Sequence, residues 1–91
     1  MIEKELIIKN ENGLHARPAS LLVKTTGKFR SEIKISKDGY VVNGKSIMGV
    51  ITLAAEKGSK LKFIIEGEDE EEAMKAIEEL IENNFYEDDK K

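Results

Sequence analysis

The dipeptide Asp38-Gly39 is the feature that most constrains how this chain can fold. It stands between residues 32–36, where polar and apolar side chains alternate strictly, and residues 40–43, which include two valines. Asp-Gly is a preferred two-residue turn between antiparallel strands, and strict alternation is typical of a strand with one buried face. The sequence therefore predicts an antiparallel hairpin, which the Asn43-Gly44 dipeptide ends.

Two further strands are predicted at residues 2–9 and 60–66, because apolar side chains recur there at every second position. Lys4 interrupts the first pattern. The second pattern is more regular, with one apolar face formed by Leu61, Phe63 and Ile65.

Helices are predicted between the strands. Apolar residues with helical spacing run from Ala16 towards Gly27, and Ser46 and Gly58 are suited to cap and to stop a second, short helix.

A third helix is predicted from Asp69 to residue 83 or 84. Asp69 and Glu72 match the spacing of a capping box, and acidic residues fill the first turn. An apolar stripe for the buried face is formed by Ala73, Ile77, Leu80 and Ile81.

The order strand-helix-strand-strand-helix-strand-helix in 91 residues predicts one domain over residues 1–86, with a frayed tail at 87–91. Composition excludes a disordered chain, since 40% of the residues are apolar, and no apolar run could span a bilayer. The predicted fold class is α+β, a two-layer sandwich with helices on one face of a four-stranded antiparallel sheet.

Composition also restricts the chemistry. The chain has no cysteine and one histidine, so disulfides, thiolate chemistry and a transition-metal site are not expected, and no cofactor is predicted. Basic residues outnumber acidic ones by 12 to 6 up to Ile65, and acidic residues outnumber basic ones by 12 to 3 after it. No aromatic residues alternate with the basic ones, so an acidic protein surface is a better partner for the basic part than a nucleic acid.

The candidate chemical group is His15. A turn signal, Asn12-Gly13, precedes it, and Pro18 follows at a distance that suits the first turn of a helix. His15 is therefore predicted at the helix N-cap or just before it, where backbone N–H groups favour a phosphate and Arg17 adds donors. An imidazole nitrogen at such a site can accept and pass on a phosphoryl group. In the alternative interpretation, His15 is a surface residue that only helps to start the helix.

Two segments resemble one family. Residues 13–19, Gly-Leu-His-Ala-Arg-Pro-Ala, resemble the active-site motif of the HPr family, the histidine phosphocarriers of the bacterial phosphoenolpyruvate:sugar phosphotransferase system. Residues 43–50, Asn-Gly-Lys-Ser-Ile-Met-Gly-Val, resemble the regulatory serine region of that family. The resemblance implies an open-faced sandwich with sheet order 1-4-2-3.

The resemblance also implies a role for each site residue. His15 accepts a phosphoryl group on Nδ1 from phospho-Enzyme I and passes it to the EIIA domain of a sugar permease, while Arg17 contacts the phosphoryl group. An apolar patch for docking both partners is formed by Ile47, Met48 and Ile51.

Ser46 matches the serine that a dedicated HPr kinase/phosphorylase modifies in Gram-positive-type members, which then bind a catabolite-control repressor. A phosphate on Ser46 adds negative charge to the docking patch. The alternative interpretation of Ser46 is simple N-capping of the short helix.

These expectations describe a cytoplasmic, monomeric phosphoryl carrier with no membrane insertion, which is not an independent catalyst. Three other functions remain open. The first is a regulatory module that acts mainly through Ser46. The second is a carrier in a nitrogen-related phosphotransfer chain. The third is an unrelated small α+β domain that binds RNA or amino acids. A fold in which His15 does not lie at a helix N-terminus would favour this third function.

Overall fold

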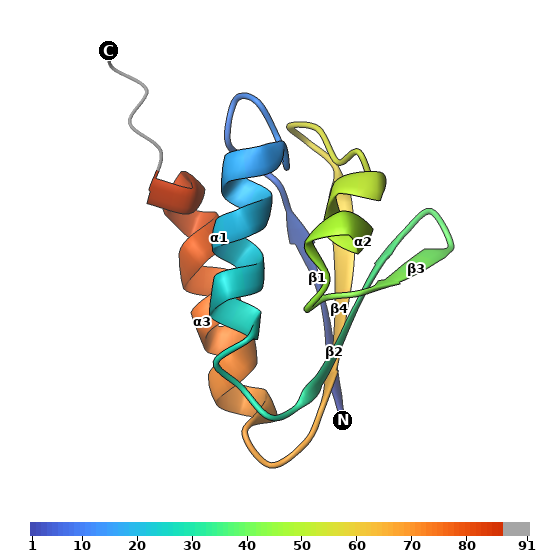
Figure 1. Ribbon diagram of the computed structural model, residues 1–91, viewed down its shortest axis with the longest axis vertical. Coiled ribbons are helices and arrows are strands. Elements are labelled where there is room, and N and C mark those ends of the chain that lie inside the picture. The colour runs from blue at the N-terminus through green and yellow to red at the C-terminus, as the bar shows by residue number, and fades with distance from the viewer. Residues whose placement is uncertain (87–91) are drawn as a thin grey trace.

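Four antiparallel strands form one sheet in the order β1-β4-β2-β3, and three helices cover one face of it in the computed structural model, which describes residues 1–86 (Figure 1). The predicted fold class and strand order are thus confirmed, while the predicted frayed tail at 87–91 lies outside the described residues. No helix within residues 1–86 has the length and apolar character needed to cross a membrane. The elements are β1 (Ile2–Ile7), α1 (Ala16–Thr26), β2 (Glu32–Lys37), β3 (Tyr40–Asn43), α2 (Ile47–Thr52), β4 (Lys60–Glu66), α3 (Glu70–Glu82) and a short 3-10 turn, η1 (Asn84–Tyr86).

The β2–β3 hairpin forms as predicted. Lys37 pairs with Tyr40 across the turn, and both central residues have left-handed backbone angles, with φ of 51° at Asp38 and 84° at Gly39. Such a turn matches the twist of antiparallel strands. It places β3 at one edge of the sheet, and the segment that follows β3 leads directly into α2.

The core lies between the sheet and the helices. The face of the sheet that α1 and α3 cover carries fully buried apolar side chains, and the opposite face of β4 carries lysines. Burial of each large apolar side chain contributes about 1.5–3 kcal/mol to folding. The largest of these core side chains are Phe63, Ile8, Leu22, Ile33, Ile35, Leu61, Ile65, Ile77 and Ile81.

Lys4 does not bury its charge. Its Nζ pairs with Glu78 of α3 at the outer edge of β1, where more than half of the lysine side chain is exposed. Two more ion pairs join residues that flank β1 to α3: Lys9 with Glu82 at 2.8 Å, and the Met1 ammonium group with Glu70 at 3.2 Å. These pairs cover the edge of β1, a common protection of an edge strand.

Helix α2 is shorter than predicted. It ends at Thr52 rather than near Gly58, so Gly58 does not stop it. The next residues turn away because Leu53 and Ala55 are buried in the core, while Ala54 adopts a left-handed φ of 49°. Burial of two apolar side chains therefore outweighs continuation of a helix that is rich in β-branched residues.

The predicted capping box at the start of α3 is wrong. Asp69 is the N-cap residue, but its carboxylate makes no bond to its own helix. It accepts hydrogen bonds from the backbone N–H groups of Arg30 and Ser31, each at 3.0 Å, and from the Ser31 hydroxyl. The Ser31 hydroxyl and the Arg30 N–H lower the pKa of Asp69 to about 2. The carboxylate of Glu70, not that of Glu72, accepts from the N–H of Gly67 at 3.0 Å.

Candidate functional site

His15 is the N-cap residue of α1, as predicted. Its backbone is extended, with φ −85° and ψ −169°, and its carbonyl oxygen accepts the N–H of Ala19 at 2.9 Å. The residue is exposed, whereas Leu14 on one side is buried. The first turn of a helix presents backbone N–H groups that lack intrahelical acceptors, so the imidazole stands beside a site that favours anions.

The loop before His15 is held against the loop after α2. The N–H of Leu14 donates to the carbonyl oxygen of Ala55 at 2.8 Å, and the Asn10 side-chain amide donates to the carbonyl of Gly13 at 2.9 Å. Gly13 has φ of 68°, and a Cβ atom there would lie 2.3 Å from the Ala55 oxygen. Only glycine fits this position, because both its backbone angle and the close approach exclude a side chain.

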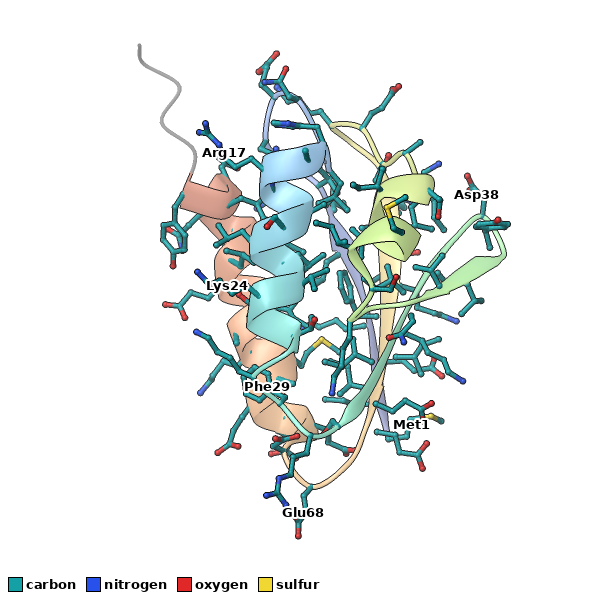
Figure 2. The ribbon with its side chains drawn as sticks, in the orientation of Figure 1. Met1, Arg17, Lys24, Phe29, Asp38 and Glu68 are labelled. Atoms are coloured by element: carbon teal, nitrogen blue, oxygen red, sulfur yellow. The ribbon has the colours of Figure 1, made fainter. Side chains whose placement is uncertain are left out.

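Arg17 lies in the first turn of α1 and is exposed. Its side chain projects from the end of α1 that carries His15, on the side of η1 (Figure 2). None of residues 16–19 is acidic, so the guanidinium group reinforces the positive end of the helix dipole. Together, an accessible nucleophilic ring and these donors can bind a phosphoryl group and accept it.

Ser46 is the N-cap residue of α2. Its Oγ accepts the N–H of Gly49 at 3.1 Å, which is the capping interaction expected from the sequence. The preceding residues are tied to the far end of α1: the buried Thr26 hydroxyl donates to the carbonyl of Gly44 at 2.8 Å, and Lys45 Nζ donates to the carbonyl of Phe29 at 2.6 Å. The unmodified Ser46 side chain therefore caps α2.

The predicted docking patch is exposed on α2. The exposed fractions are 38% for Ile47, 67% for Met48 and 37% for Ile51, whereas Val50 faces the core. Helix α2 packs against α1 and against β3. The structure thus brings the patch to the helix that carries His15 and Arg17, and the Leu14–Ala55 hydrogen bond ties the residues that follow α2 to the His15 loop.

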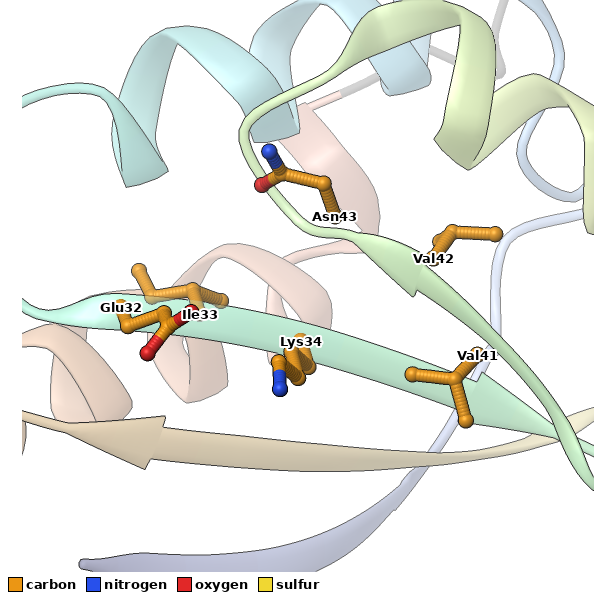
Figure 3. A pocket seen from close by; sticks show the side chains of 6 residues that line it. All are labelled: Glu32, Ile33, Lys34, Val41, Val42 and Asn43. Carbon is orange, nitrogen blue, oxygen red and sulfur yellow. The ribbon is translucent and has the colours of Figure 1, made fainter.

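A surface hollow lies elsewhere, on the β2–β3 hairpin (Figure 3). It is far from His15 along the fold, because β2 follows the opposite end of α1 (Figure 1). Apolar and charged side chains mix in its lining, and none of the candidate site residues takes part. Its lining residues are Glu32, Ile33, Lys34, Val41, Val42 and Asn43.

Two features of the site were not predicted from the sequence. One is the contact between Gly13 and residues 55–56, which brings together segments about 40 positions apart in the chain. The other is Phe85, which is buried in the core from η1. The Asn12-Gly13 turn signal agrees with the positive φ at Gly13, but it does not indicate which distant segment Gly13 contacts. The short segment after α3 has no apolar periodicity from which the burial of Phe85 could have been predicted.

Residues 2–83 match the family model described as the phosphorylation site of the HPr component of the phosphotransferase system. The chain is 52% identical over 88 residues to phosphocarrier protein HPr from Xylella fastidiosa, covering 97% of this chain and 99% of that protein.

Solved structures are equally similar. A crystal structure of HPr from Thermoanaerobacter tengcongensis has a TM-score of 0.93 and 51% identity, with 97% of this chain and 99% of that chain covered. A crystal structure described as an HPr dimer from the same organism has a TM-score of 0.77 and 52% identity, with 96% and 100% covered.

Proposed function

The chain belongs to the HPr family of phosphocarriers of the phosphotransferase system, and we propose that it carries a phosphoryl group on His15. The observation that carries this proposal is the exposed imidazole at the N-cap of α1, in the same helical turn as Arg17. Phosphate groups bind readily at helix N-termini, and a guanidinium group forms charge-assisted hydrogen bonds with phosphate oxygens.

In the proposed reaction, the unprotonated Nδ1 of His15 supplies the electron pair that attacks the phosphorus atom of phospho-Enzyme I. A P–N bond to His15 forms while the bond between phosphorus and the donor breaks. An EIIA domain then takes the phosphoryl group in a second transfer of the same kind. Arg17 binds the phosphoryl oxygens during both transfers and so lowers the cost of bringing the charged group to the ring.

The test is to incubate the protein with phosphoenolpyruvate, Enzyme I and the magnesium that Enzyme I requires, and to locate added phosphate by mass spectrometry at alkaline pH. Acid-labile phosphate on His15 is expected. His15→Ala should accept none, and Arg17→Ala should accept it roughly 10²-fold more slowly. Arg30→Ala is the matched control, because Arg30 is the other arginine and lies beyond the opposite end of α1. An His15→Ala variant that is phosphorylated as fast as the wild type would falsify the proposal.

The docking patch of Ile47, Met48 and Ile51 is proposed to bind both Enzyme I and EIIA. Met48, the most exposed of the three, has a flexible and polarisable side chain that suits a surface with several partners. Met48→Ala should weaken both transfers, whereas Val41→Ala, which removes a side chain with 54% exposure on β3, should leave them unchanged. Equal rates for wild type and Met48→Ala would remove the patch from the proposal.

Ser46 is proposed as a second, regulatory phosphorylation site for an HPr kinase/phosphorylase. A phosphate there adds about two negative charges next to the docking patch, which disfavours an acidic partner surface. Transfer from Enzyme I to His15 should therefore slow after Ser46 is phosphorylated with ATP and the kinase. Unchanged transfer would separate the modification from control of His15.

The alternatives predict different products. A mainly regulatory protein should acquire phosphate on Ser46 from kinase and ATP but none on His15 from Enzyme I. A carrier in a nitrogen-related chain should accept phosphate on His15 only from the first enzyme of that chain. The carrier is proposed to act as a monomer, which size-exclusion chromatography with light scattering checks, since the similar Thermoanaerobacter protein has a dimeric crystal form.

A further inference from the structure

The turn after α3 has an unusual backbone. Asn84, Phe85 and Tyr86 have φ values of 53°, 56° and 55°, all in the left-handed region that L-residues rarely adopt. No other run of three non-glycine residues with positive φ occurs within residues 1–86. Left-handed backbone at such residues persists only when the surroundings hold it in place, and it is concentrated at functional positions.

Contacts on both sides hold this turn. Phe85 is 2% exposed and belongs to the hydrophobic core, and η1 packs against both α1 and α3. The N–H of Tyr86 donates to the carbonyl of Asn83 at 2.8 Å, and the Asn83 side-chain amide donates to the carbonyl of Glu79 at 2.7 Å. The buried ring and these bonds give η1 one defined orientation.

The same turn leaves a tyrosine exposed next to the buried Phe85. Tyr86 is 62% exposed although its neighbour Phe85 is buried. Figure 1 shows η1 next to the half of α1 that carries His15, on the opposite side of α1 from α2. Arg17 projects on the same side as η1 (Figure 2). Helix α1 is therefore flanked by the apolar patch of α2 on one side and by η1 on the other.

A protein that reaches His15 has to cover a surface much wider than one helix. A typical specific interface buries about 800 Å² on each partner, which corresponds to a disc with a radius of about 16 Å. Packed helices lie about 8–10 Å apart. A footprint centred on His15 therefore extends over both neighbours of α1, and it includes η1 as well as the patch.

We propose that Tyr86 is a specificity-determining contact for the protein that donates the phosphoryl group to His15, and that the left-handed turn holds its ring ready for that partner. The inference rests on the proposed function of His15. Tyrosine is enriched among the residues that dominate binding energy, because its ring buries a large area with few rotatable bonds. A backbone already ordered in the free protein lowers the entropic cost of docking.

The test is the initial rate of His15 phosphorylation by phosphoenolpyruvate and Enzyme I as a function of the concentration of this protein. Tyr86→Ala should raise KM at least about fivefold and leave kcat unchanged, as expected for loss of a docking contact. Tyr86→Phe keeps the ring and should stay close to the wild type. Tyr40→Ala is the matched control: Tyr40 has the same 62% exposure but lies on β3, and its variant should keep the wild-type KM.

The outcomes separate this proposal from the function on which it rests. Phosphorylation of His15 in Tyr86→Ala with the wild-type KM overturns the role of Tyr86 and leaves the carrier function standing. An equal rise of KM in Tyr40→Ala overturns it too, because the effect is then not specific to η1. Wild-type protein that accepts no phosphate overturns both. Thermal unfolding of each variant should stay at the wild-type midpoint, since neither tyrosine is buried, and a large drop for Tyr86→Ala alone assigns Tyr86 a structural role instead.

Discussion

Leu14 donates its backbone N–H to the carbonyl oxygen of Ala55 over 2.8 Å. This bond joins the residue before His15 to the segment that follows α2. Both Leu14 and Ala55 are buried, so the bond is shielded from water, and its loss would leave a buried N–H and a buried carbonyl group without partners.

 The position of His15 at the start of α1 thus depends on how α2 ends.

We predict that Gly13→Ala disturbs this contact. The new Cβ would lie 2.3 Å from the Ala55 oxygen and 2.8 Å from Glu56 Cα, at a backbone φ of 68°. The free energy of unfolding, measured by urea denaturation, should fall by roughly 2 kcal/mol or more. Phosphorylation of His15 by Enzyme I should slow as well.

Gly39→Ala is the control for Gly13→Ala. Gly39 also has a positive φ, of 84°, but no atom lies within 4 Å of the position that a Cβ would take. Only the backbone strain applies there, at about 1–2 kcal/mol, and phosphorylation should keep its wild-type rate. Equal losses in the two variants would show that the contact with residues 55–56 adds nothing.

We predict that Asp69 makes stability depend on pH in the acidic range. Hydrogen bonds from Ser31 and Arg30 lower the pKa of Asp69 from 3.8 to about 2 in the folded protein. A carboxylate whose pKa is lower in the folded than in the unfolded state stabilises the fold fully at pH values above its unfolded-state pKa. This stabilisation is lost as the pH falls through the folded-state pKa. In urea titrations, wild type should therefore be more stable than Asp69→Asn near neutral pH, and the difference should shrink between about pH 4 and pH 2.

Glu72→Gln serves as the control for Asp69→Asn. Glu72 is exposed in the first turn of α3, and the capping box that was predicted to join it to Asp69 does not form. The difference in unfolding free energy between Glu72→Gln and the wild type should stay within about 1 kcal/mol at every pH, which is the effect of one carboxylate on the helix dipole. A pH-independent difference between wild type and Asp69→Asn would contradict the assignment of these hydrogen bonds.

We predict that Thr26→Val loosens the segment before Ser46. The Thr26 hydroxyl is buried and donates to the carbonyl of Gly44, and valine has nearly the same shape but no donor. Loss of this partner should cost roughly 1–3 kcal/mol of unfolding free energy, because the Gly44 carbonyl is left unsatisfied. Thr25→Val, at the neighbouring and partly exposed position, should change the same quantity by less than about 0.5 kcal/mol.

Ser46 variants should separate capping from regulation. Ser46→Ala removes the acceptor for the Gly49 N–H and should lower the free energy of unfolding by about 1 kcal/mol. Ser46→Asp keeps an N-cap acceptor and should be close to the wild type in thermal unfolding, yet it adds a charge beside the docking patch. Slower transfer from Enzyme I to Ser46→Asp than to Ser46→Ala is expected. The reverse order would argue against charge as the basis of the regulation.

Local sequence signals predicted those parts of this protein that depend on neighbouring residues. The Asp38-Gly39 turn, the strand at residues 60–66 and the place of His15 at the start of α1 were all predicted, because turn geometry, alternation and helix termination act within a few residues. The role of Ser46 as an N-cap belongs to the same group.

The contacts between groups that are distant in the sequence could be seen only in the folded protein. The Asp69 carboxylate accepts hydrogen bonds from Arg30 and Ser31 rather than from its own helix, because the loop after α1 places three donors beside it. Helix α2 ended at Thr52 because Leu53 and Ala55 are buried in a core that other segments form. The left-handed turn of η1 likewise depends on the burial of Phe85. Local propensity is worth only tenths of a kcal/mol per residue, so contacts with distant segments settle these positions.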